Sequence, residues 1–366
     1  MRKTGITDLP LHYGTCPPWL FKRMKELSGA IIKVIVLEYG QDEFIRRLSD
    51  PFFFQSFGCV LGFDFHSSGL TTTVCGAMKE AIKPEELGIA VVGGKGKSSR
   101  KTPTEIEKVA DTFNLSEKNI EKLKYSSRMS AKVDNVAVQD GFTLYHHTLV
   151  FTEKGKWAVI QQGMDVQSRY ARRYHWLSEN IKSFVEEPHA AICCDKKQQF
   201  VLDMTAAQSG EARKISVDVV NENPNKLLKI FKKQTLINDF LGQKTLEFRM
   251  CAKHYIVDAK RVNMKTLQKV HEIKPKNYEE FISIQNVGPK IVRALALISD
   301  IIYGKPPSWE DPVKYSYAHG GKDGVPYPVD KKTYDTSISI LKNAIEEAEL
   351  GKTEKIKAIK RLEGFM

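Results

Sequence analysis

Residues 281–304 read FISIQNVGPKIVRALALISDIIYG, and this stretch decides how the second part of the chain is interpreted. Apolar residues recur at helical spacing on both sides of a short polar segment, which predicts two helices joined by a tight turn. Asn277 can cap the first helix, and Glu280, three residues later, completes a capping box. Gly288 supplies the freedom to turn, and Pro289 suits the first position of the second helix.

Such a turn leaves backbone N–H groups at a helix start facing outward beside Lys290, where they suit a phosphate. The pattern over residues 277–304 resembles a helix-hairpin-helix, a module that grips the DNA backbone without reading bases. Val287, Gly288 and Lys290 are then the expected backbone-binding residues. Asn286 stands where the module usually has its first glycine, and Asn tolerates left-handed geometry. The alternative is an ordinary helix pair capped by a Gly-Pro turn.

The composition indicates an intracellular protein with a polyanionic partner. The chain has 366 residues, room for two or three domains, and a formal net charge of +12. This charge favours nucleic acid first and an anionic membrane surface second, and we expect no membrane partner. No apolar run reaches membrane-spanning length, and the N-terminus lacks a signal-peptide core. The six cysteines form no Cys-x-x-Cys pair, so we expect a reduced, cytoplasmic protein.

Periodicity predicts an α+β protein in two parts. Residues 142–151 and 156–163 alternate in hydrophobicity around a Glu-Lys-Gly turn, which predicts a β-hairpin. We therefore expect a mixed domain over residues 1–217, with a small sheet or β-hairpin, that carries any chemistry. A mainly helical domain over residues 218–366 should contain the helix-hairpin-helix. Residues 221–270 hold 11 Lys and Arg against 4 Asp and Glu, either a DNA-binding extension of the hairpin or a solvated helix face.

A glycine-rich basic segment, GGKGKSSRKT, spans residues 93–102. A Walker motif would need glycine at the position of Val91, so we predict neither ATP hydrolysis nor any nucleotide cofactor. What remains is a flexible basic loop whose cations suit the phosphates of nucleic acid. Its candidate phosphate-binding residues are Lys95, Lys97 and Arg100. The alternative is a mobile surface loop.

Histidines with polar or acidic neighbours are the second functional signal. Histidine and carboxylate together can bind a divalent metal such as Mg²⁺ or Mn²⁺, or serve as general acid and base. Asp64, before small hydroxyl residues, resembles the first metal-binding strand of several nuclease folds, although a turn or cap also explains it. A strand places neighbouring histidines on opposite faces, so at most one of His146 and His147 joins a given site. The candidate catalytic residues are Asp64, His66, Asp140, His146, His147 and His175.

Two further basic segments are candidates for nucleic-acid contact. Arg128 lies near other polar residues, among them Asp134 and the later Gln161. Arg172 and Arg173 alternate with tyrosines, a pattern that can hold phosphates and stack bases. The alternative for these two arginines is an amphipathic helix with a solvated face.

Several specific strings resemble an uncharacterised domain-of-unknown-function family found in archaea and some bacteria. They include FGCVLGFDFHSSGLTTTVCGAMKEA, GGKGKSSRKTP, SSRMSAKVDNVAVQDGFTLYHH, WAVIQQGM, RRYHW and AHGGKDGVPYPVDKKTYD. The match covers nearly the whole chain. It implies no particular reaction, but it reinforces the link to a helix-hairpin-helix segment and to DNA transactions.

The C-terminal part also resembles the helix-hairpin-helix DNA glycosylases. Lys290 occupies the position of their catalytic lysine, and Pro328-Val329-Asp330 resembles their aspartate motif. The resemblance implies attack of an amine on the sugar C1′, with a carboxylate stabilising the developing cation. The separation of Lys290 from Asp330 is longer than is usual in that family, and Asp330 also suits the N-cap of a final helix.

Three functions follow from these patterns. The first is a nuclease-like enzyme of DNA processing or repair that cleaves phosphodiester bonds. The second is a DNA glycosylase/AP lyase that uses Lys290 and Asp330. The third is a non-catalytic DNA-binding adaptor for repair or replication proteins. All three expect DNA as the partner, held through its backbone with little sequence specificity.

Overall fold

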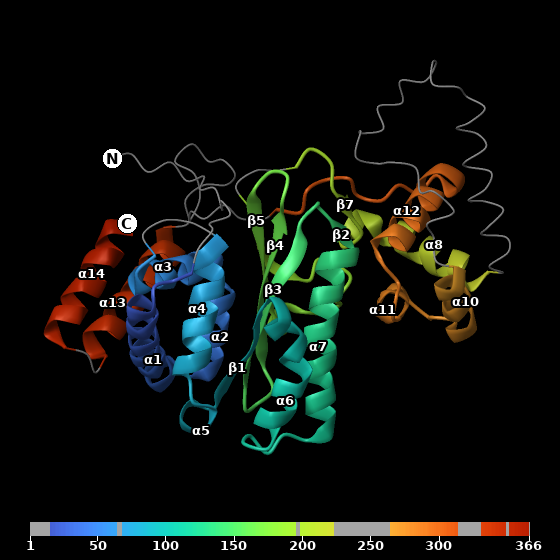
Figure 1. Cartoon of the computed structure of the whole chain (residues 1–366). Coiled ribbons are helices and arrows are strands. Elements are labelled where there is room, and N and C mark those ends of the chain that lie inside the picture. The colour runs from blue at the N-terminus through green and yellow to red at the C-terminus, as the bar shows by residue number, and fades with distance from the viewer. Residues whose placement is uncertain are drawn as a thin grey trace.

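The computed structural model describes residues 15–63, 68–194, 198–222, 264–313, 331–348 and 351–365. At its centre is a five-stranded antiparallel sheet with strand order β1-β3-β4-β5-β6 (Figure 1). The predicted α+β class is thus confirmed. The strands of this sheet are β1 (Ile89–Lys95), β3 (Thr143–Thr152), β4 (Trp157–Asp165), β5 (Tyr170–Leu177) and β6 (His189–Cys193). Two short strands, β2 (Val138–Gln139) and β7 (Leu202–Asp203), pair separately.

The predicted β-hairpin is confirmed as β3 and β4. The register pairs Phe151 with Trp157, next to the turn. Gly155 takes a left-handed φ of 76°, and its amide donates to the Thr152 carbonyl at 2.8 Å. Side chains alternate between the two faces along each strand, and most of those on β3 and β4 are buried on both faces because helices cover both sides of the sheet.

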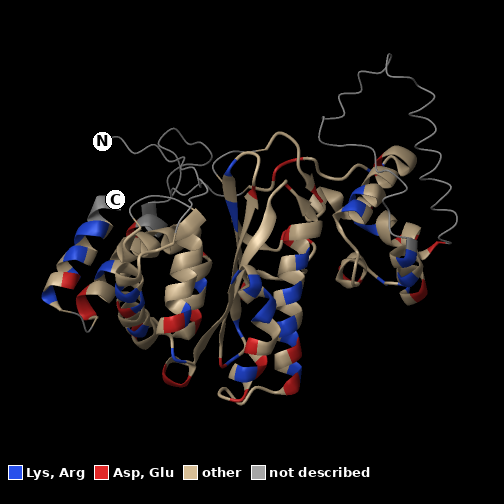
Figure 2. Ribbon diagram, viewed as in Figure 1, with Lys and Arg blue, Asp and Glu red and all other residues tan. Residues whose placement is uncertain are grey.

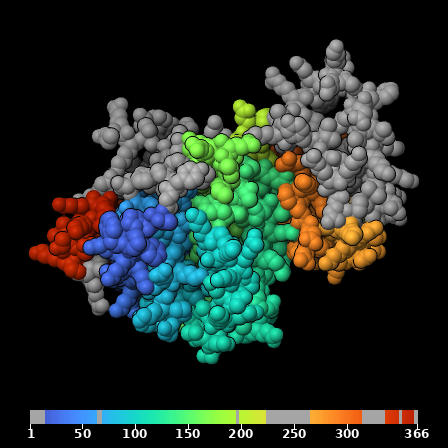
Figure 3. Space-filling model, in the orientation of Figure 1, coloured from blue at the N-terminus to red at the C-terminus, as the bar shows by residue number. Residues whose placement is uncertain are grey.

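Helices from the N-terminal part of the described chain cover one face of the sheet, and the last two helices pack behind them (Figure 1), so the first and last described residues lie side by side (Figure 3). Val150, Ala158 and Ile160 project into this layer's core. Within the described ranges, no helix combines the length and the apolar character needed to cross a membrane. The helices of this layer are α1 (Pro18–Tyr39), α2 (Gln41–Ser49), α3 (Pro51–Leu61), α4 (Ser68–Ala81), α13 (Lys331–Glu347) and α14 (Lys352–Phe365), and α5 (Pro84–Leu87) leads into β1.

The opposite face of the sheet packs against a second helical layer. Leu149, Phe151 and Trp176 project into its core. The predicted domain boundary near residue 218 falls inside α8, and helices on both sides of that boundary contribute to this one hydrophobic cluster. The layer consists of α6 (Thr102–Ala110), α7 (Glu117–Val136), α8 (Gly210–Asn221), α10 (Met264–Ile273), α11 (Tyr278–Ser283) and α12 (Pro289–Tyr303). Two short 3₁₀ turns, η2 (Ser178–Asn180) and η3 (Ala207–Ser209), follow β5 and precede α8.

The α11–α12 turn follows the predicted helix bounds but not the predicted turn residue. The Asn277 side chain caps α11 by accepting from the Glu280 amide at 2.8 Å, and Gly304, with φ 63°, ends α12. We predicted that Gly288 supplies the conformational freedom of the turn. Instead, Asn286 takes the left-handed φ of 70°, and Gly288 is the N-cap of α12 with φ −120°. Asparagine can occupy this left-handed region because its short polar side chain hydrogen-bonds locally.

The glycine-rich segment is ordered, and the prediction of a flexible loop was wrong. Its first residues complete β1, the next six form the 3₁₀ helix η1 (Gly96–Lys101), and Thr102 begins α6. Gly93 is held from two sides, because its amide donates to the Glu105 carboxylate at 2.7 Å and its carbonyl accepts from Lys79 Nζ at 2.8 Å. The pattern was misread because glycines that permit a positive φ within a strand look like loop residues in sequence.

Candidate active site and nucleic-acid interface

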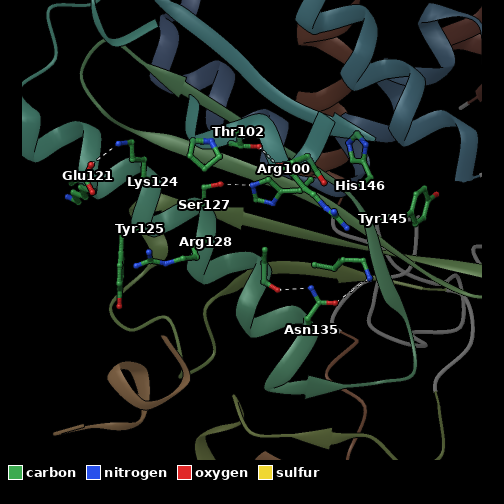
Figure 4. A pocket seen from close by; sticks show the side chains of 16 residues that line it. Arg100, Thr102, Glu121, Lys124, Tyr125, Ser127, Arg128, Asn135, Tyr145 and His146 are labelled. Carbon is green, nitrogen blue, oxygen red and sulfur yellow. Dashed lines mark hydrogen bonds and ion pairs between the residues drawn. The ribbon is translucent and has the colours of Figure 1, made fainter. Parts of the chain in front are cut away.

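A pocket of about 740 Å³ lies between η1, the start of α6, one side of α7 and the start of β3. Figure 4 shows the side chains around it. Arg100 comes from η1, Ser127 and Arg128 come from α7, and His147 comes from β3. The pocket therefore sits where the second helical layer meets the sheet.

A chain of buried hydrogen bonds runs inward from this pocket. Ser127 Oγ lies 2.8 Å from His147 Nε2, and His147 Nδ1 lies 2.9 Å from Gln161 Oε1. Gln161 Nε2 in turn donates to Asp134 Oδ2 at 2.6 Å. We call these four residues the Ser127 relay. Its members come from α7, β3 and β4, and all four are buried.

Asp134 anchors the inner end of the relay. The indole N–H of Trp176 donates to Asp134 Oδ2 at 3.0 Å, and His189 Nε2 lies 2.5 Å from Oδ1. A carboxylate accepts hydrogen bonds, so the side of Gln161 that faces Asp134 must be its NH₂ group. The carbonyl oxygen of Gln161 is therefore directed at His147.

The direction of every proton in the relay follows from this anchor. Gln161 Oε1 can only accept, so His147 carries its proton on Nδ1. The Nε2 atom of the neutral imidazole is then an acceptor, and the Ser127 hydroxyl donates to it. Burial lowers the pKa of His147 below its ordinary value, against the opposing effects of Gln161 and Asp134. The imidazole is thus held neutral near pH 7, as a general base must be.

Cations line the mouth of the pocket. Arg100 and Arg128 are exposed, and neither forms an ion pair with another described residue. The Arg128 guanidinium lies 5.5 Å from the centre of the Tyr125 ring. Lys124, in contrast, is paired with Glu107 and Glu121. Figure 2 shows Lys and Arg positions recurring along α6 and α7.

The α11–α12 turn is attached to the same helix that lines the pocket. Lys132 Nζ, one helical turn beyond Arg128, donates to the Ile284 carbonyl at 3.2 Å. Gln139, just beyond the end of α7, donates to the Pro289 carbonyl at 2.8 Å. Burial, and secondarily the charge of Arg128, lower the pKa of Lys132. The pocket and the turn therefore share one side of α7.

Comparison with known proteins identifies the family but no activity. The sequence pattern of a protein family of unknown function, DUF763, matches residues 5–329. The chain belongs to this family. Comparison with curated proteins and with solved structures gave no match. The predicted resemblance to an uncharacterised family is confirmed.

His147 and His146 face opposite sides of the sheet, as strand geometry predicts. His146 accepts or donates one hydrogen bond, with Thr148 Oγ1 at 2.9 Å, and its Nδ1 atom has no partner among the described residues. Burial, then the charges of His147 and Lys95, lower the pKa of His146 to about 3. Of the two histidines, His147 is the one whose ring belongs to the relay.

Asp140 and Arg172 lie together in the interior, away from the pocket-lining residues. Arg172 donates to Asp140 at 3.0 Å and to both oxygens of Asp311, at 2.9 and 2.7 Å. The Tyr174 hydroxyl also donates to Asp140, at 2.6 Å. Burial raises the pKa of Asp140, and the charge of Arg172 opposes that rise. In this DUF763 protein Arg172 is a fully buried partner of two carboxylates.

Arg173 and His175 project from β5 toward the other helical layer, and both are fully buried. Arg173 donates to Thr71 and to Gln55, each at 3.3 Å. The segment that holds Arg172 and Arg173 is a strand, so the alternative of an amphipathic helix with a solvated face was wrong, and contact of these arginines with nucleic acid stays a prediction. Burial, and then the charge of Arg173, lower the pKa of His175 well below its ordinary value.

The remaining predicted residues divide between the surface and the undescribed segments. Lys95, Lys97 and Lys290 are exposed, Gly288 is half-buried and Val287 is buried. Within the described part of the chain, no group of three or more His, Cys, Asp or Glu side chains could hold a metal ion. Asp64, His66 and Asp330 lie outside the described residues, so the predicted metal strand and the aspartate of the predicted glycosylase pair are not described.

Ser127 was not predicted as a functional residue, although a signal for it exists. Ser127, Ser130 and Asp134 recur at helical spacing on the buried side of α7. Polar residues on the apolar side of a helix require partners in the core. The sequence shows this requirement, but it does not show which strand supplies the partner.

Proposed function

We propose that this DUF763 protein binds the phosphodiester backbone of nucleic acid, with DNA as the first candidate, and processes it in the pocket beside α7. The observation that supports the proposal is that the pocket and the α11–α12 turn contact the same helix, α7. This helix lines the pocket with Arg128 and, one turn later, holds the α11–α12 turn through Lys132. A nucleic-acid strand that lies along this side of α7 would meet the cations of the pocket mouth and then Lys290. Such a row of positive charges suits a polyanion.

In this proposal α11 and α12 act as a helix-hairpin-helix. The φ of −120° at Gly288 is accessible to any residue, and a Cβ atom there would meet nothing closer than the Asn286 carbonyl oxygen at 3.9 Å. Neither backbone strain nor internal packing therefore requires glycine at position 288. Close approach of a phosphate from solvent would explain why glycine stands at position 288. The amides of Gly288 and Lys290 donate no hydrogen bond to another described residue, so they remain available to an anion.

The proposed processing is a nuclease-like cleavage of phosphodiester bonds. His147 supports it, because it is a predicted catalytic residue whose side chain is directed into the pocket relay. A divalent metal remains a candidate participant, and the test below includes it. Base excision through Lys290 gains no additional support, since its predicted partner Asp330 is not described.

Binding is tested by fluorescence anisotropy of labelled duplex DNA over a range of salt concentrations. The double substitution Gly288→Val with Lys290→Glu should raise Kd at least about tenfold and lower the salt dependence by about one counterion. Lys154→Glu is the matched control, because it reverses the same charge at the exposed β3–β4 turn, and it should change affinity much less. Equal affinities for the double variant and the unmodified chain would remove the hairpin from the proposal.

Processing is tested on labelled single-stranded, duplex and flap DNA with Mg²⁺, Mn²⁺ or chelator, read on a denaturing gel. Cleavage that is weakened by Arg128→Glu would support the pocket as the processing site. Salt-sensitive binding without cleavage of any substrate would instead leave a DNA-binding adaptor.

A further inference from the structure

We propose that Ser127 is a catalytic nucleophile that His147 activates to attack phosphate esters in the α7 pocket. The substrate class rests on the proposed function, because the same pocket cations are invoked in both. The nucleophile itself rests on the geometry of the relay alone. The two parts can therefore fail separately.

The relay has the arrangement that an activated serine requires. The nucleophile and its base are within hydrogen-bond distance, at 2.8 Å, and a third group orients the base. Gln161 holds the imidazole so that its free lone pair faces the hydroxyl. Both Ser127 and His147 line the pocket, so a reacting atom has room beside them.

Two other buried helical serines satisfy their hydroxyl groups differently. Ser130 donates to the Ser127 carbonyl at 3.1 Å, and Ser216 donates to the Ala212 carbonyl at 2.7 Å. A helical serine thus has an acceptor within its own helix at no cost to the rest of the core. Ser127 instead donates to a histidine on β3, which lengthens the chain of buried polar groups to Asp134. The Ser127 hydroxyl could find an acceptor within its own helix, so its need for a hydrogen bond does not by itself explain that chain.

The pocket mouth selects the substrate class. Arg100 and Arg128 are exposed, and the described chain supplies them with no carboxylate partner. Guanidinium groups present planar forks of N–H donors that match phosphate oxygens, and their charge offsets the charge that accumulates in phosphoryl transfer. A phosphate ester therefore fits better than an uncharged carboxylic ester.

The proposed step balances without a further reactant. The Ser127 Oγ–phosphorus bond forms while the hydroxyl proton passes to His147 Nε2. The bond from phosphorus to the leaving alcohol breaks, and the imidazolium returns its proton to that alcohol. Water then repeats the sequence in reverse: its proton goes to His147, its oxygen bonds to phosphorus, and Ser127 leaves and regains a proton.

The first experiment treats the full chain with diisopropyl fluorophosphate, which forms the same oxygen–phosphorus bond with loss of fluoride. Mass spectrometry should place one phosphoryl adduct on the peptide that contains Ser127. Ser127→Ala should abolish that adduct, whereas Ser130→Ala, which removes a neighbouring buried hydroxyl, should label within about twofold of the unmodified chain. Circular dichroism confirms that each variant folds. A folded chain without an adduct at Ser127 would overturn the proposal.

The second experiment compares hydrolysis of bis(p-nitrophenyl) phosphate with that of p-nitrophenyl acetate. Preference for the phosphodiester, lost in Ser127→Ala, supports the substrate class, and preference for the acetate overturns it. Labelling of Ser127 is measured without DNA, so it reports on the nucleophile whether or not the chain binds DNA. Failure of DNA binding and failure of the nucleophile are thereby distinguished.

Discussion

β3 and β4 hold two histidine–glutamine pairs at adjacent register positions, and the two pairs point to opposite sides of the sheet. His147 pairs with Gln161 on the side of α7, and His146 pairs with Gln162 on the side of α4. His147 and Gln161 are hydrogen-bonded to each other and to Ser127 and Asp134. Gln162 instead accepts from Thr71 Oγ1 at 2.5 Å and donates to the Ser68 carbonyl and the Tyr145 hydroxyl.

The difference shows that residue type does not decide whether a buried pair forms a relay. The strand presents the same two side chains to each helical layer. Among the described residues, only α7 offers a hydroxyl bonded to the histidine itself and a carboxylate behind the glutamine. On the other side His146 is bonded to Thr148, which belongs to the same strand and also hydrogen-bonds to the Cys75 thiol of α4, so within the described residues no hydroxyl or thiol from another element bonds to His146 directly.

The largest expected effect is on the rate of Ser127 labelling when each histidine is replaced by asparagine in turn. His147→Asn should slow diisopropyl fluorophosphate labelling of Ser127 by about 100-fold or more, because the general base is removed. His146→Asn should leave the labelling rate within about twofold. The rates are followed by mass spectrometry, with urea unfolding to confirm that both variants are folded. Equal slowing of the two variants would show that the two faces do not differ as described.

A smaller effect is expected from the glutamines. Gln161→Leu should slow labelling by about tenfold, because the His147 Nδ1–H loses its acceptor and the ring its orientation. The midpoint of the pH–rate profile should also move to lower pH, since the Gln161 bond raises the pKa of His147.

Gln162→Leu is the matched variant on the other face. It should lower the free energy of unfolding by about 1–3 kcal/mol, because it leaves buried partners unsatisfied. Its labelling rate and pH profile should stay unchanged. A shifted profile in Gln162→Leu, or none in Gln161→Leu, would argue against the assigned orienting role.

The smallest expected effect is a pH dependence of stability. Burial lowers the pKa of His146 from the ordinary 6.5 to about 3, so between these values the unfolded chain binds a proton that the folded chain does not. Stability from this residue is therefore present above pH 6.5 and is lost as pH falls toward 3, by up to about 1.4 kcal/mol per pH unit. Urea unfolding at pH 7, 6 and 5 should show a shallower loss in His146→Gln. Parallel losses in both proteins would mean that His146 is not held neutral by the fold.

Local signals in the sequence predicted the elements whose causes are local. The β3–β4 hairpin, the capped α11 and the stop at Gly304 each depend on residues within a few positions of one another. The helical alternative for the segment with Arg172 failed for the opposite reason. Arg172 is buried beside two carboxylates, Asp140 and Asp311, which lie 32 and 139 residues away, and no periodicity reveals those partners.

The candidate site was predictable only in part. Strand alternation correctly separated His146 from His147, and Arg128 and Arg100 were selected as cations that now line one pocket. Ser127 was missed because helix period and strand period are independent patterns. Nothing in either one fixes which turn of α7 lies over which residue of β3, since that depends on packing of the whole layer.

The packing of the last helices on the first ones has a consequence for biosynthesis. Arg361 on α14 donates to the Val60 carbonyl of α3, a contact that spans 301 residues. At ribosomal rates of about 5–20 residues per second, α3 waits on the order of 15–60 s for this partner. During that interval the side of α1 and α3 that α13 and α14 later cover is open to solvent. We expect the nascent chain to depend on chaperones, and folding to be limited by this closure of high contact order.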